Sequence, residues 1–432
     1  MPSESKRILS RLAESRYAHD IRKVTTSATL SQLLFIASTP LLTRLYAPED
    51  FGVLAIFVSI LGIVPVVATL RYDIAISLSA DKQESFHTLT LCLVGSVACT
   101  ALVAIVFGSG VLEGTEFAQL QPYWWLVSIG TLAVGVFTAL NAWVGYEQQF
   151  GLVARVKLKQ AFSSVVAQII LGLLTAGPLG LLVGYVISQF YGATSFAVAA
   201  MRARPERFSV RQVWAAAAKY RRFFYFSFPA GVVNRLGIHI VPVLFGYFYS
   251  LPTAGFFLLA QRLVALPMMV IGTSVAQVYT NRLAKDSLVG GTRLMPTYIK
   301  TVLLLLATGL VPMALLVAFA PWLFELVFGN EWRIAGEFCQ VLVPAFYAQF
   351  VVAPMIQTLN VLGYQMTQLI WDILRLTAIV AVFVASPQLG YSDYTAVIAV
   401  STTLCTMYVM QFLLSVWAIK RHDKRIQVVT RS

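Results

Sequence analysis

The feature that most constrains this chain is a series of long apolar stretches separated by short polar segments. A helix needs about 20 apolar residues to cross the hydrocarbon core of a bilayer. Hydrophobic residues make up 58% of the chain and charged residues only 12%, whereas a typical soluble domain is about 25% charged. The pattern predicts an all-α polytopic membrane protein and excludes a cytosolic enzyme. We expect twelve transmembrane helices, at residues 24–45, 51–78, 87–108, 122–146, 150–175, 179–200, 224–248, 253–278, 297–320, 336–362, 366–386 and 394–418.

The positive charges predict how the chain crosses the membrane. There are 32 Lys and Arg against 19 Asp and Glu, which gives a net charge of +13. With the N-terminus inside, 27 of the 32 fall on the cytoplasmic side and only Arg44 and Arg333 fall outside. This asymmetry follows the positive-inside rule and places both termini in the cytoplasm. It also explains the positive net charge, so we expect no binding of nucleic acid. The cytoplasmic segments are then a basic N-tail at 1–23, a linker at 201–223 and a C-tail at 419–432.

Two short patterns recur along the chain, which predicts a duplicated six-helix unit. In the first pattern, two prolines are followed by an adjacent Phe and Gly at the start of a predicted helix. In the second pattern, an Asn precedes an adjacent Gly and Tyr. Both units start inside, so they form parallel repeats, with an N-lobe at 24–200 and a C-lobe at 224–418 around a central cationic cavity. The matching positions are Pro40, Pro48 and Phe51-Gly52 with Pro242, Pro252 and Gly255-Phe256, then Asn141 and Gly145-Tyr146 with Asn360 and Gly363-Tyr364.

Three arginines fall near the middle of predicted helices. These are Arg235, Arg262 and Arg375, and Asp372 is the only carboxylate at that depth. Charges there are costly and face a partner or a hydrated cavity. Arg375 can pair with Asp372 one turn away, whereas Arg235 and Arg262 outnumber the available carboxylates and favour a cationic cavity. An anionic substrate follows, and phosphate suits Arg and Lys best.

The repeat offset also places Lys157 opposite Arg375. Arg155, Lys157 and Lys159 are therefore either further cavity cations or the basic cytoplasmic end of their helix.

Neutral polar side chains at helical spacing form a second set of candidates. They either hydrogen-bond between helices or face a sugar in a wide cavity. The members of this set are Asn141, Gln349, Gln357 and Asn360.

Patterns for covalent, ATP-dependent or metal chemistry are missing from the sequence. There is no Walker A loop and no H-E-x-x-H or C-x-x-C pattern, so we expect no cofactor and no metal site. A passive or secondary transporter remains, with H⁺ or Na⁺ as candidate coupling ions. Asp372, Asn234 and His239 are the coupling candidates, because an ionisable group that changes state with the cavity can drive release. The alternative is that Asp372 only neutralises Arg375.

The run Ser38-Thr39-Pro40-Leu41-Leu42-Thr43-Arg44-Leu45-Tyr46-Ala47-Pro48-Glu49-Asp50-Phe51-Gly52 resembles the start of bacterial oligosaccharide flippases of the O-antigen type. The stretch Leu70-Arg71-Tyr72-Asp73-Ile74-Ala75-Ile76 is similar to the same family, as is the second-half series from Phe228-Pro229 to Pro267. Arg44 and Arg71 lie inside these motifs, where they either bind substrate or anchor helix ends. The superfamily also holds multidrug exporters and the peptidoglycan-precursor flippase.

The resemblance implies transfer of an undecaprenyl-pyrophosphate-linked oligosaccharide from the cytoplasmic to the periplasmic leaflet by alternating access. Such a protein serves O-antigen, capsule or exopolysaccharide assembly in the bacterial inner membrane. A polysaccharide polymerase and a chain-length regulator are candidate partners. Two alternatives stay open: a cation-coupled multidrug exporter, which is expected to have an acidic cavity, and a membrane-embedded glycosyltransferase or polymerase, which usually needs a large external loop.

Overall fold

The computed structural model describes residues 4–110, 116–174, 177–202, 208–265, 271–289 and 294–429. Within these ranges the chain is helical, with no strand, which confirms the predicted all-α class. Ten helices in this part of the chain are long and apolar enough to cross a membrane. They coincide with ten of the twelve predicted stretches. The other two stretches correspond to α1 (Glu4–Leu45), which extends far beyond its predicted start, and to the region around the shorter apolar helix α10 (Leu251–Val264).

The chain divides into two compact units. Unit 1 comprises Met1–Tyr46 and Ile60–Val232, and unit 2 comprises Ala47–Ser59 and Val233–Ser432. The division falls inside α2 (Pro48–Thr69) and α9 (Phe228–Phe248). The first half of α2 therefore belongs with the second half of the chain.

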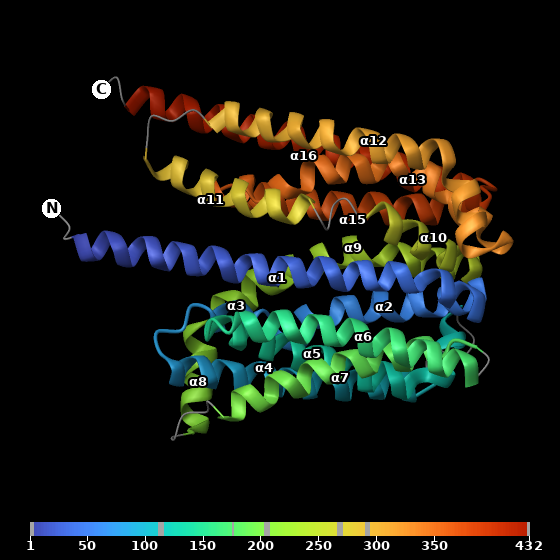
Figure 1. Cartoon of the computed structure of the whole chain (residues 1–432), viewed down its shortest axis with the longest axis horizontal. Coiled ribbons are helices and arrows are strands. Elements are labelled where there is room, and N and C mark those ends of the chain that lie inside the picture. The colour runs from blue at the N-terminus through green and yellow to red at the C-terminus, as the bar shows by residue number, and fades with distance from the viewer. Residues whose placement is uncertain are drawn as a thin grey trace. The chain divides into compact units, whose positions relative to one another are not determined.

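Unit 1 is a bundle in which α6 packs on α1 and α7, and α5 packs on α4 and α7 (Figure 1). Its core is centred on Trp143, Tyr72 and Phe196. The helices are α3 (Tyr72–Ile76), α4 (Lys82–Gly108), α5 (Trp124–Tyr146), α6 (Phe150–Leu174), α7 (Leu179–Arg202) and α8 (Val210–Lys219), together with α1, part of α2, the 3₁₀-helix Glu116–Tyr123 and the π-helical segment Phe223–Ser227.

In unit 2 one helix, α13 (Arg333–Val352), packs against α10, α12 and α16 (Figure 1). The core contains Tyr298, Phe350 and Trp371. The remaining elements are α11 (Thr273–Val289), α12 (Leu294–Phe328), Asn330–Trp332, Ala353–Met355, α14 (Thr358–Val361), α15 (Gln365–Gln388) and α16 (Asp393–Val429).

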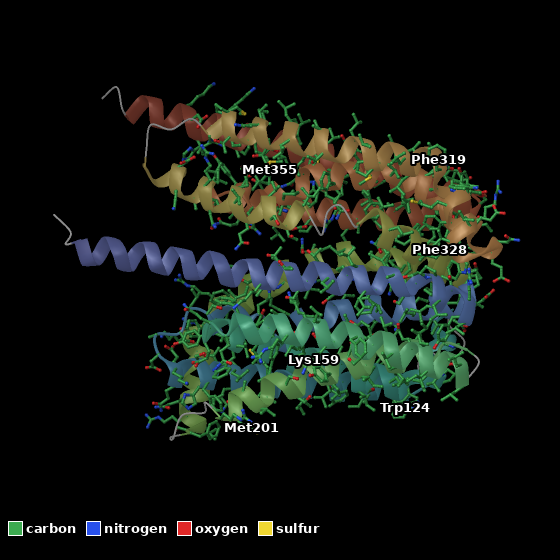
Figure 2. The ribbon with its side chains drawn as sticks, viewed as in Figure 1. Trp124, Lys159, Met201, Phe319, Phe328 and Met355 are labelled. Carbon is green, nitrogen blue, oxygen red and sulfur yellow. The ribbon has the colours of Figure 1, made fainter. Side chains whose placement is uncertain are left out.

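Many large apolar side chains lie on the surface of each unit, as expected for helices that contact lipid. Trp124 of unit 1 is 39% exposed and Phe319 of unit 2 is 52% exposed (Figure 2). In water such a surface would promote association, whereas hydrocarbon solvates it. The chain is a multi-pass membrane protein.

Three predicted helices are shorter than the sequence suggested. The stretch 51–78 ends at Thr69, because Leu70 and Arg71 adopt left-handed backbone conformations with φ of 49° and 65°, which a helix does not accommodate. Within the stretch 253–278, α10 ends at Val264 and α11 begins at Thr273. Residues 266–270 of this stretch lie outside the described part of the chain.

The third correction concerns the stretch 336–362. Helix α13 ends at Val352, a tight turn follows at Ala353–Met355, and α14 starts at Thr358. Pro354 lies in the turn and cannot donate the hydrogen bond that would continue the helix. The basic linker at 201–223 contains a helix, α8, that the prediction omitted.

The repeated proline and glycine motifs pack against each other within unit 2. A Cβ at Gly52 would overlap the carbonyl of Leu251, and a Cβ at Gly255 would overlap the carbonyl of Pro48. The N-terminal turns of α2 and α10 are thus in backbone contact, and glycine permits this approach. Each helix contributes the same kind of residue to the crossing.

Candidate functional site

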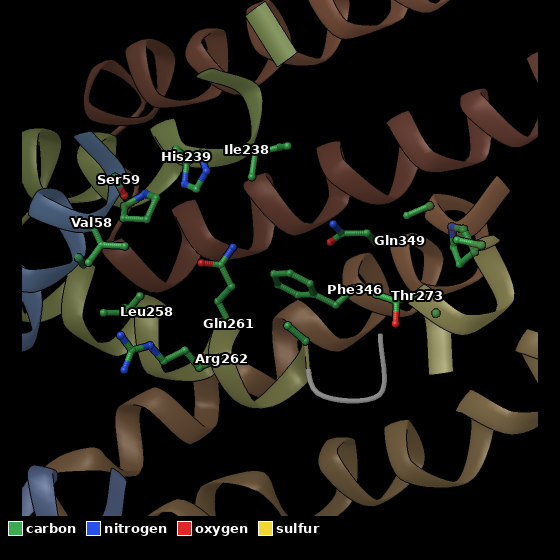
Figure 3. Close-up of a pocket in the computed structure, with 17 residues that line it drawn as sticks. Val58, Ser59, Ile238, His239, Leu258, Gln261, Arg262, Thr273, Phe346 and Gln349 are labelled. Atoms are coloured by element: carbon green, nitrogen blue, oxygen red, sulfur yellow. The ribbon is translucent and has the colours of Figure 1, made fainter. Parts of the chain in front are cut away.

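A pocket of about 530 Å³ lies within unit 2. Its walls come from the first half of α2 and from α9, α10, α11 and α13, with Ala353 and Pro354 of the turn that follows α13. Figure 3 shows Gln261, Phe346 and Gln349 projecting into it. The volume lies in the range of small-molecule sites, about 300–1,000 Å³.

The polar groups of this pocket are a cation, two amides, an imidazole and hydroxyls. Arg262 and Gln261 come from α10, Gln349 from α13 and His239 from α9. No Asp or Glu is among its lining residues in the described part of the chain. The rest of the wall is largely apolar, including Phe346. A group that combines negative charge with hydrogen-bonding oxygens would match this lining.

Arg262 occupies a different local environment from the one expected. The sequence placed it in the middle of a continuous helix, whereas it lies in the last turn of α10, which ends at Val264. A cation in this position is stabilised by the partial negative charge of the helix C-terminus. The end of α10 therefore places Arg262 at the pocket and stabilises its positive charge there.

A second cationic surface lies in unit 1, in a groove of about 810 Å³ between α1 and α6. Arg155 and Lys159 line it from α6, and Lys23 lines it from α1 with Thr26 and Ser27. Arg155 and Lys159 are four residues apart, so they share one helix face.

All three of these groove cations, Lys23, Arg155 and Lys159, are exposed. The described residues provide no ion pair for any of them. Lys157, the third predicted cation on α6, is half-buried and outside the groove lining.

Asp372 lies at the centre of a buried polar network in unit 2. Asn234 of α9 donates its side-chain amide to Asp372 Oδ1 at 2.8 Å, and Arg375 donates to the same oxygen at 3.2 Å. Gln368 Nε2 lies 3.4 Å from Oδ2, and Gln411 of α16 donates to Gln368 at 3.0 Å. Groups from α9 and α15 therefore contact the carboxylate, and α16 joins the network through Gln368.

Arg375 is held by this network rather than exposed in a cavity. Its side chain is 4% exposed, and its guanidinium carbon lies 4.7 Å from the ring centre of Trp371. Trp371 in turn donates to the carbonyl of Met407 at 2.8 Å. A Cβ at Gly237 would lie 2.8 Å from the guanidinium, so this glycine leaves room for it. The alternative in which Asp372 pairs with Arg375 describes the geometry observed.

The remaining predicted cations are dispersed over the two units. Arg235 is half-buried on α9, one turn before His239. Arg44 is exposed in the last turn of α1. Arg71 of unit 1 lies against Gly231, where an added Cβ would be 2.8 Å from its Nε. Its neighbour in sequence, Asp73, accepts a hydrogen bond from Thr69 at 2.8 Å.

The predicted row of neutral polar residues is divided by the turn after α13. Gln349 lines the pocket of unit 2, whereas Asn360 donates to Gln357 at 2.9 Å on the far side of the turn. Helical spacing did not apply across the break, so these residues do not share a face. Asn141 is half-buried on α5 and is not among the residues that line the groove of unit 1.

Some residues of both sites escaped the sequence reasoning. Gln261 precedes Arg262 directly, but a single amide beside an arginine is not a recognisable signal. Lys23 was assigned to the basic tail, although α1 runs without interruption from Glu4 and brings it to the groove. Gln411 joins the network only because α16 packs on α15. Gln368 lies one turn before Asp372 on α15, a spacing that the sequence shows.

A family of known proteins matches most of this chain. Residues 41–336 match the family described as polysaccharide biosynthesis protein. No curated protein matches the chain.

Solved structures of similar fold are transporters. An inward-facing multidrug resistance MATE family transporter of the MOP superfamily aligns with a TM-score of 0.68 and 13% identity, over 93% of this chain and 98% of that one. The lipid II flippase MurJ, in an inward closed conformation, aligns with a TM-score of 0.66 and 13% identity, over 92% and 91%. The Vibrio cholerae MATE transporter VcmN in its bent form gives 0.55 and 14%, over 95% and 98%.

The family match includes Arg262 in the pocket of unit 2 and the α6 wall of the groove, and it leaves out Lys23 and Gln349. The chain belongs to the polysaccharide biosynthesis protein family, with the fold of MATE transporters and of the lipid II flippase MurJ.

Proposed function

We propose that the protein is a flippase that moves an undecaprenyl-pyrophosphate-linked oligosaccharide from the cytoplasmic to the periplasmic leaflet of the bacterial inner membrane. Its product serves assembly of O-antigen, capsule or exopolysaccharide. Membership of the polysaccharide biosynthesis family supports this substrate class, and the fold similarity to a protein named lipid II flippase supports a lipid-linked cargo.

The observation that carries the proposal is the pocket of unit 2, with Arg262, Gln261 and Gln349 on its wall and no acidic lining residue in the described part of the chain. A pyrophosphate does not cross hydrocarbon unaided, whereas a prenyl chain can remain in the lipid. Guanidinium and amide N–H groups replace the water around phosphate oxygens. The barrier is thus lowered for the head of the substrate and not for the tail.

The exposed groove of unit 1 adds Lys23, Arg155 and Lys159 to the candidate cations. In the proposed mechanism these residues attract the pyrophosphate electrostatically, and the protein alternates between inward-open and outward-open states. Both termini lie in the cytoplasm in this scheme, as the distribution of Lys and Arg indicates.

The test is a deletion strain complemented with Arg262 variants. Without the protein, single lipid-linked repeat units should accumulate in the cytoplasmic leaflet. Arg262→Glu should fail to restore export, and Arg262→Lys should restore part of it, because Lys keeps the charge and not the bidentate geometry. Arg211→Ala, which removes an exposed cation of α8, is the matched control and should restore export fully.

Normal delivery of the repeat units to the periplasm in the deletion strain, in the absence of a second flippase, would refute the function. Full export by Arg262→Ala at normal abundance would instead refute only the role of this residue.

A second candidate is a cation-coupled multidrug exporter, because one of the similar folds is a multidrug resistance transporter. Such a protein exports cationic amphiphiles, for which an arginine-lined pocket is unfavourable. A deletion strain with increased drug sensitivity and normal glycan would favour this function over the flippase.

Coupling to H⁺ or Na⁺ is part of our proposal, with Asp372 as the group to test and with Asn234 and His239 as its helpers. Transport into inside-out vesicles should depend on an imposed ion gradient. Asp372→Asn should remove that dependence if the carboxylate is the coupling group. An unchanged dependence in this variant would exclude it.

A further inference from the structure

A second pocket in unit 2, of about 550 Å³, lies between α11 and α12. These helices follow one another in the chain (Figure 1) and contact each other directly. None of the residues that line this pocket lines the pocket around Arg262. It is therefore a separate site.

The lining of this pocket changes character along the helices. Arg282 of α11 and Lys300 of α12 lie toward the ends that connect the two helices in sequence. Val278 and Leu304 lie about one turn further from those ends, a distance of about 6 Å along a helix. Thr301 lies beside Lys300 and adds a hydroxyl. The pocket thus has a cationic end and a mainly apolar end, where Ser274 lies one turn beyond Val278.

The charge at the cationic end is not neutralised from within the pocket. No Asp or Glu is among the described lining residues. Arg282 makes a contact of 3.7 Å with Asp286, one turn away on the same helix, through Nε. Arg282 and Lys300 are both exposed, so they are accessible to a ligand from outside the unit.

The surface around the pocket is apolar. Val278 is 69% exposed and Leu304 is 53% exposed, and on α12 the neighbouring Leu303 and Leu310 are 59% and 58% exposed. A membrane protein turns such a face toward the acyl chains. The opposite face of α11 carries Thr273 and Ala276, which line the Arg262 pocket. The gap between α11 and α12 therefore has exposed apolar walls, as a lipid-binding groove requires.

We propose that this pocket binds an anionic phospholipid, with the phosphate between Arg282 and Lys300 and the first part of an acyl chain along Val278 and Leu304. Charge complementarity selects the anionic head, because each Lys or Arg near a membrane surface contributes about 1 kcal/mol toward anionic lipid. The apolar end selects an amphiphile over free phosphate, which would leave that end in contact with water. The assignment does not rest on the identity of the transported substrate.

The experiment measures binding and thermal stabilisation of the purified full-length protein in detergent micelles. Phosphatidylglycerol, phosphatidylcholine and inorganic phosphate are added separately at equal ionic strength. Phosphatidylglycerol should raise the unfolding midpoint more than phosphatidylcholine does, and phosphate should give no increment. The double variant Arg282→Gln/Lys300→Gln should weaken phosphatidylglycerol binding by roughly 30-fold.

The matched control is Lys285→Gln/Lys420→Gln, which removes two exposed cations that lie outside the pocket and should retain the increment. Leu304→Trp provides a test that keeps both cations, because the indole would fill the apolar end and should abolish the increment.

An equal increment from phosphatidylcholine or from phosphate would overturn the proposal. An unchanged phosphatidylglycerol increment in both Arg282→Gln/Lys300→Gln and Leu304→Trp would do the same. If the double variant does not fold, Leu304→Trp decides alone.

Discussion

Gly255 of α10 lies directly against the backbone of Pro48 at the start of α2. A Cβ at this position would overlap the Pro48 carbonyl oxygen and would lie 2.9 Å from the nitrogen of Gly52. Gly52 makes the reciprocal approach to Leu251. Phe51 then packs edge-on against Trp332, with ring centres 4.9 Å apart. Main-chain contacts thus set the distance between α2 and α10, and the ring contact of Phe51 with Trp332 packs beside them.

Replacing Gly255 with Ala should therefore destabilise unit 2. The obstacle is backbone and cannot rotate away, so we expect a loss at the upper end of the usual range for overpacking, about 1–3 kcal/mol. Gly145→Ala is the control, because a Cβ there would have no neighbouring atom of another element within 4 Å; alanine also favours helix. The thermal midpoint in detergent should fall for the first variant and hold or rise for the second. Equal midpoints would contradict the packing argument.

The pair formed by Asp372 and Arg375 gives a second prediction. Removing one partner of a buried ion pair leaves an uncompensated charge and typically destabilises by about 3–5 kcal/mol. Asp372→Asn and Arg375→Gln should each lower abundance and the thermal midpoint, and the double variant should recover most of the loss. Comparing the three variants in one thermodynamic cycle measures the coupling. Additive losses would show that the pair is not energetically linked.

The third prediction concerns Arg155 and Lys159 in the groove of unit 1. Arg155 and Lys159 repel each other at a spacing of four residues, which disfavours the helix by about 0.2–0.5 kcal/mol. The variant Arg155→Gln/Lys159→Gln should thus fold as well as the parent or slightly better. Export should nevertheless decrease if the groove receives the pyrophosphate. Unchanged export with unchanged abundance would remove the groove from the transport path.

Orientation can be tested by cysteine labelling. Cys92, Cys99 and Cys339 are buried and Cys405 is half-buried, so the background is Cys405→Ser. In intact cells a membrane-impermeant maleimide should label Ser109→Cys at the end of α4. It should label Ala218→Cys on α8 only after the inner membrane is permeabilised. The reverse pattern would invert the topology. Both positions are exposed, so poor access would not explain a negative result.

The sequence predicted the positions of the helical stretches well because a bilayer crossing needs about 20 apolar residues. It did not predict how far α1, α12 and α16 extend beyond those stretches. The ends of α6 at Phe150 and of α5 at Tyr146 lie where polar residues interrupt the apolar run. The breaks after Thr69, Val264 and Val352 lie inside apolar runs. Arg71 lies at the first break and Pro354 at the third, but Pro65 and Arg375 lie inside continuous helices. A charge or a proline alone therefore does not predict where a helix ends.

The same limit applies to the sites. The contact of Asp372 with Arg375 could be predicted, because residues three apart on a helix are neighbours. The approach of Asn234 and Gln411 could not, since it depends on how α9 and α16 pack around α15. The grouping of His239, Arg262 and Gln349 around one pocket depends on three helices in the same way. The sequence showed that each of these residues is polar, but it did not show that they lie close together.

The crossing of α2 and α10 has a consequence for how this protein can change over time. Where two side chains face each other, a larger side chain can be accommodated by a smaller neighbour, one substitution at a time. At Gly52 and Gly255 the facing atoms are main chain, so no second substitution offers relief. The two recurring motifs can diverge at positions that face side chains. Where the backbones of α2 and α10 touch, both motifs must keep a glycine. Side chains that face other side chains can be exchanged over time, while the spacing of α2 and α10 at this crossing is kept.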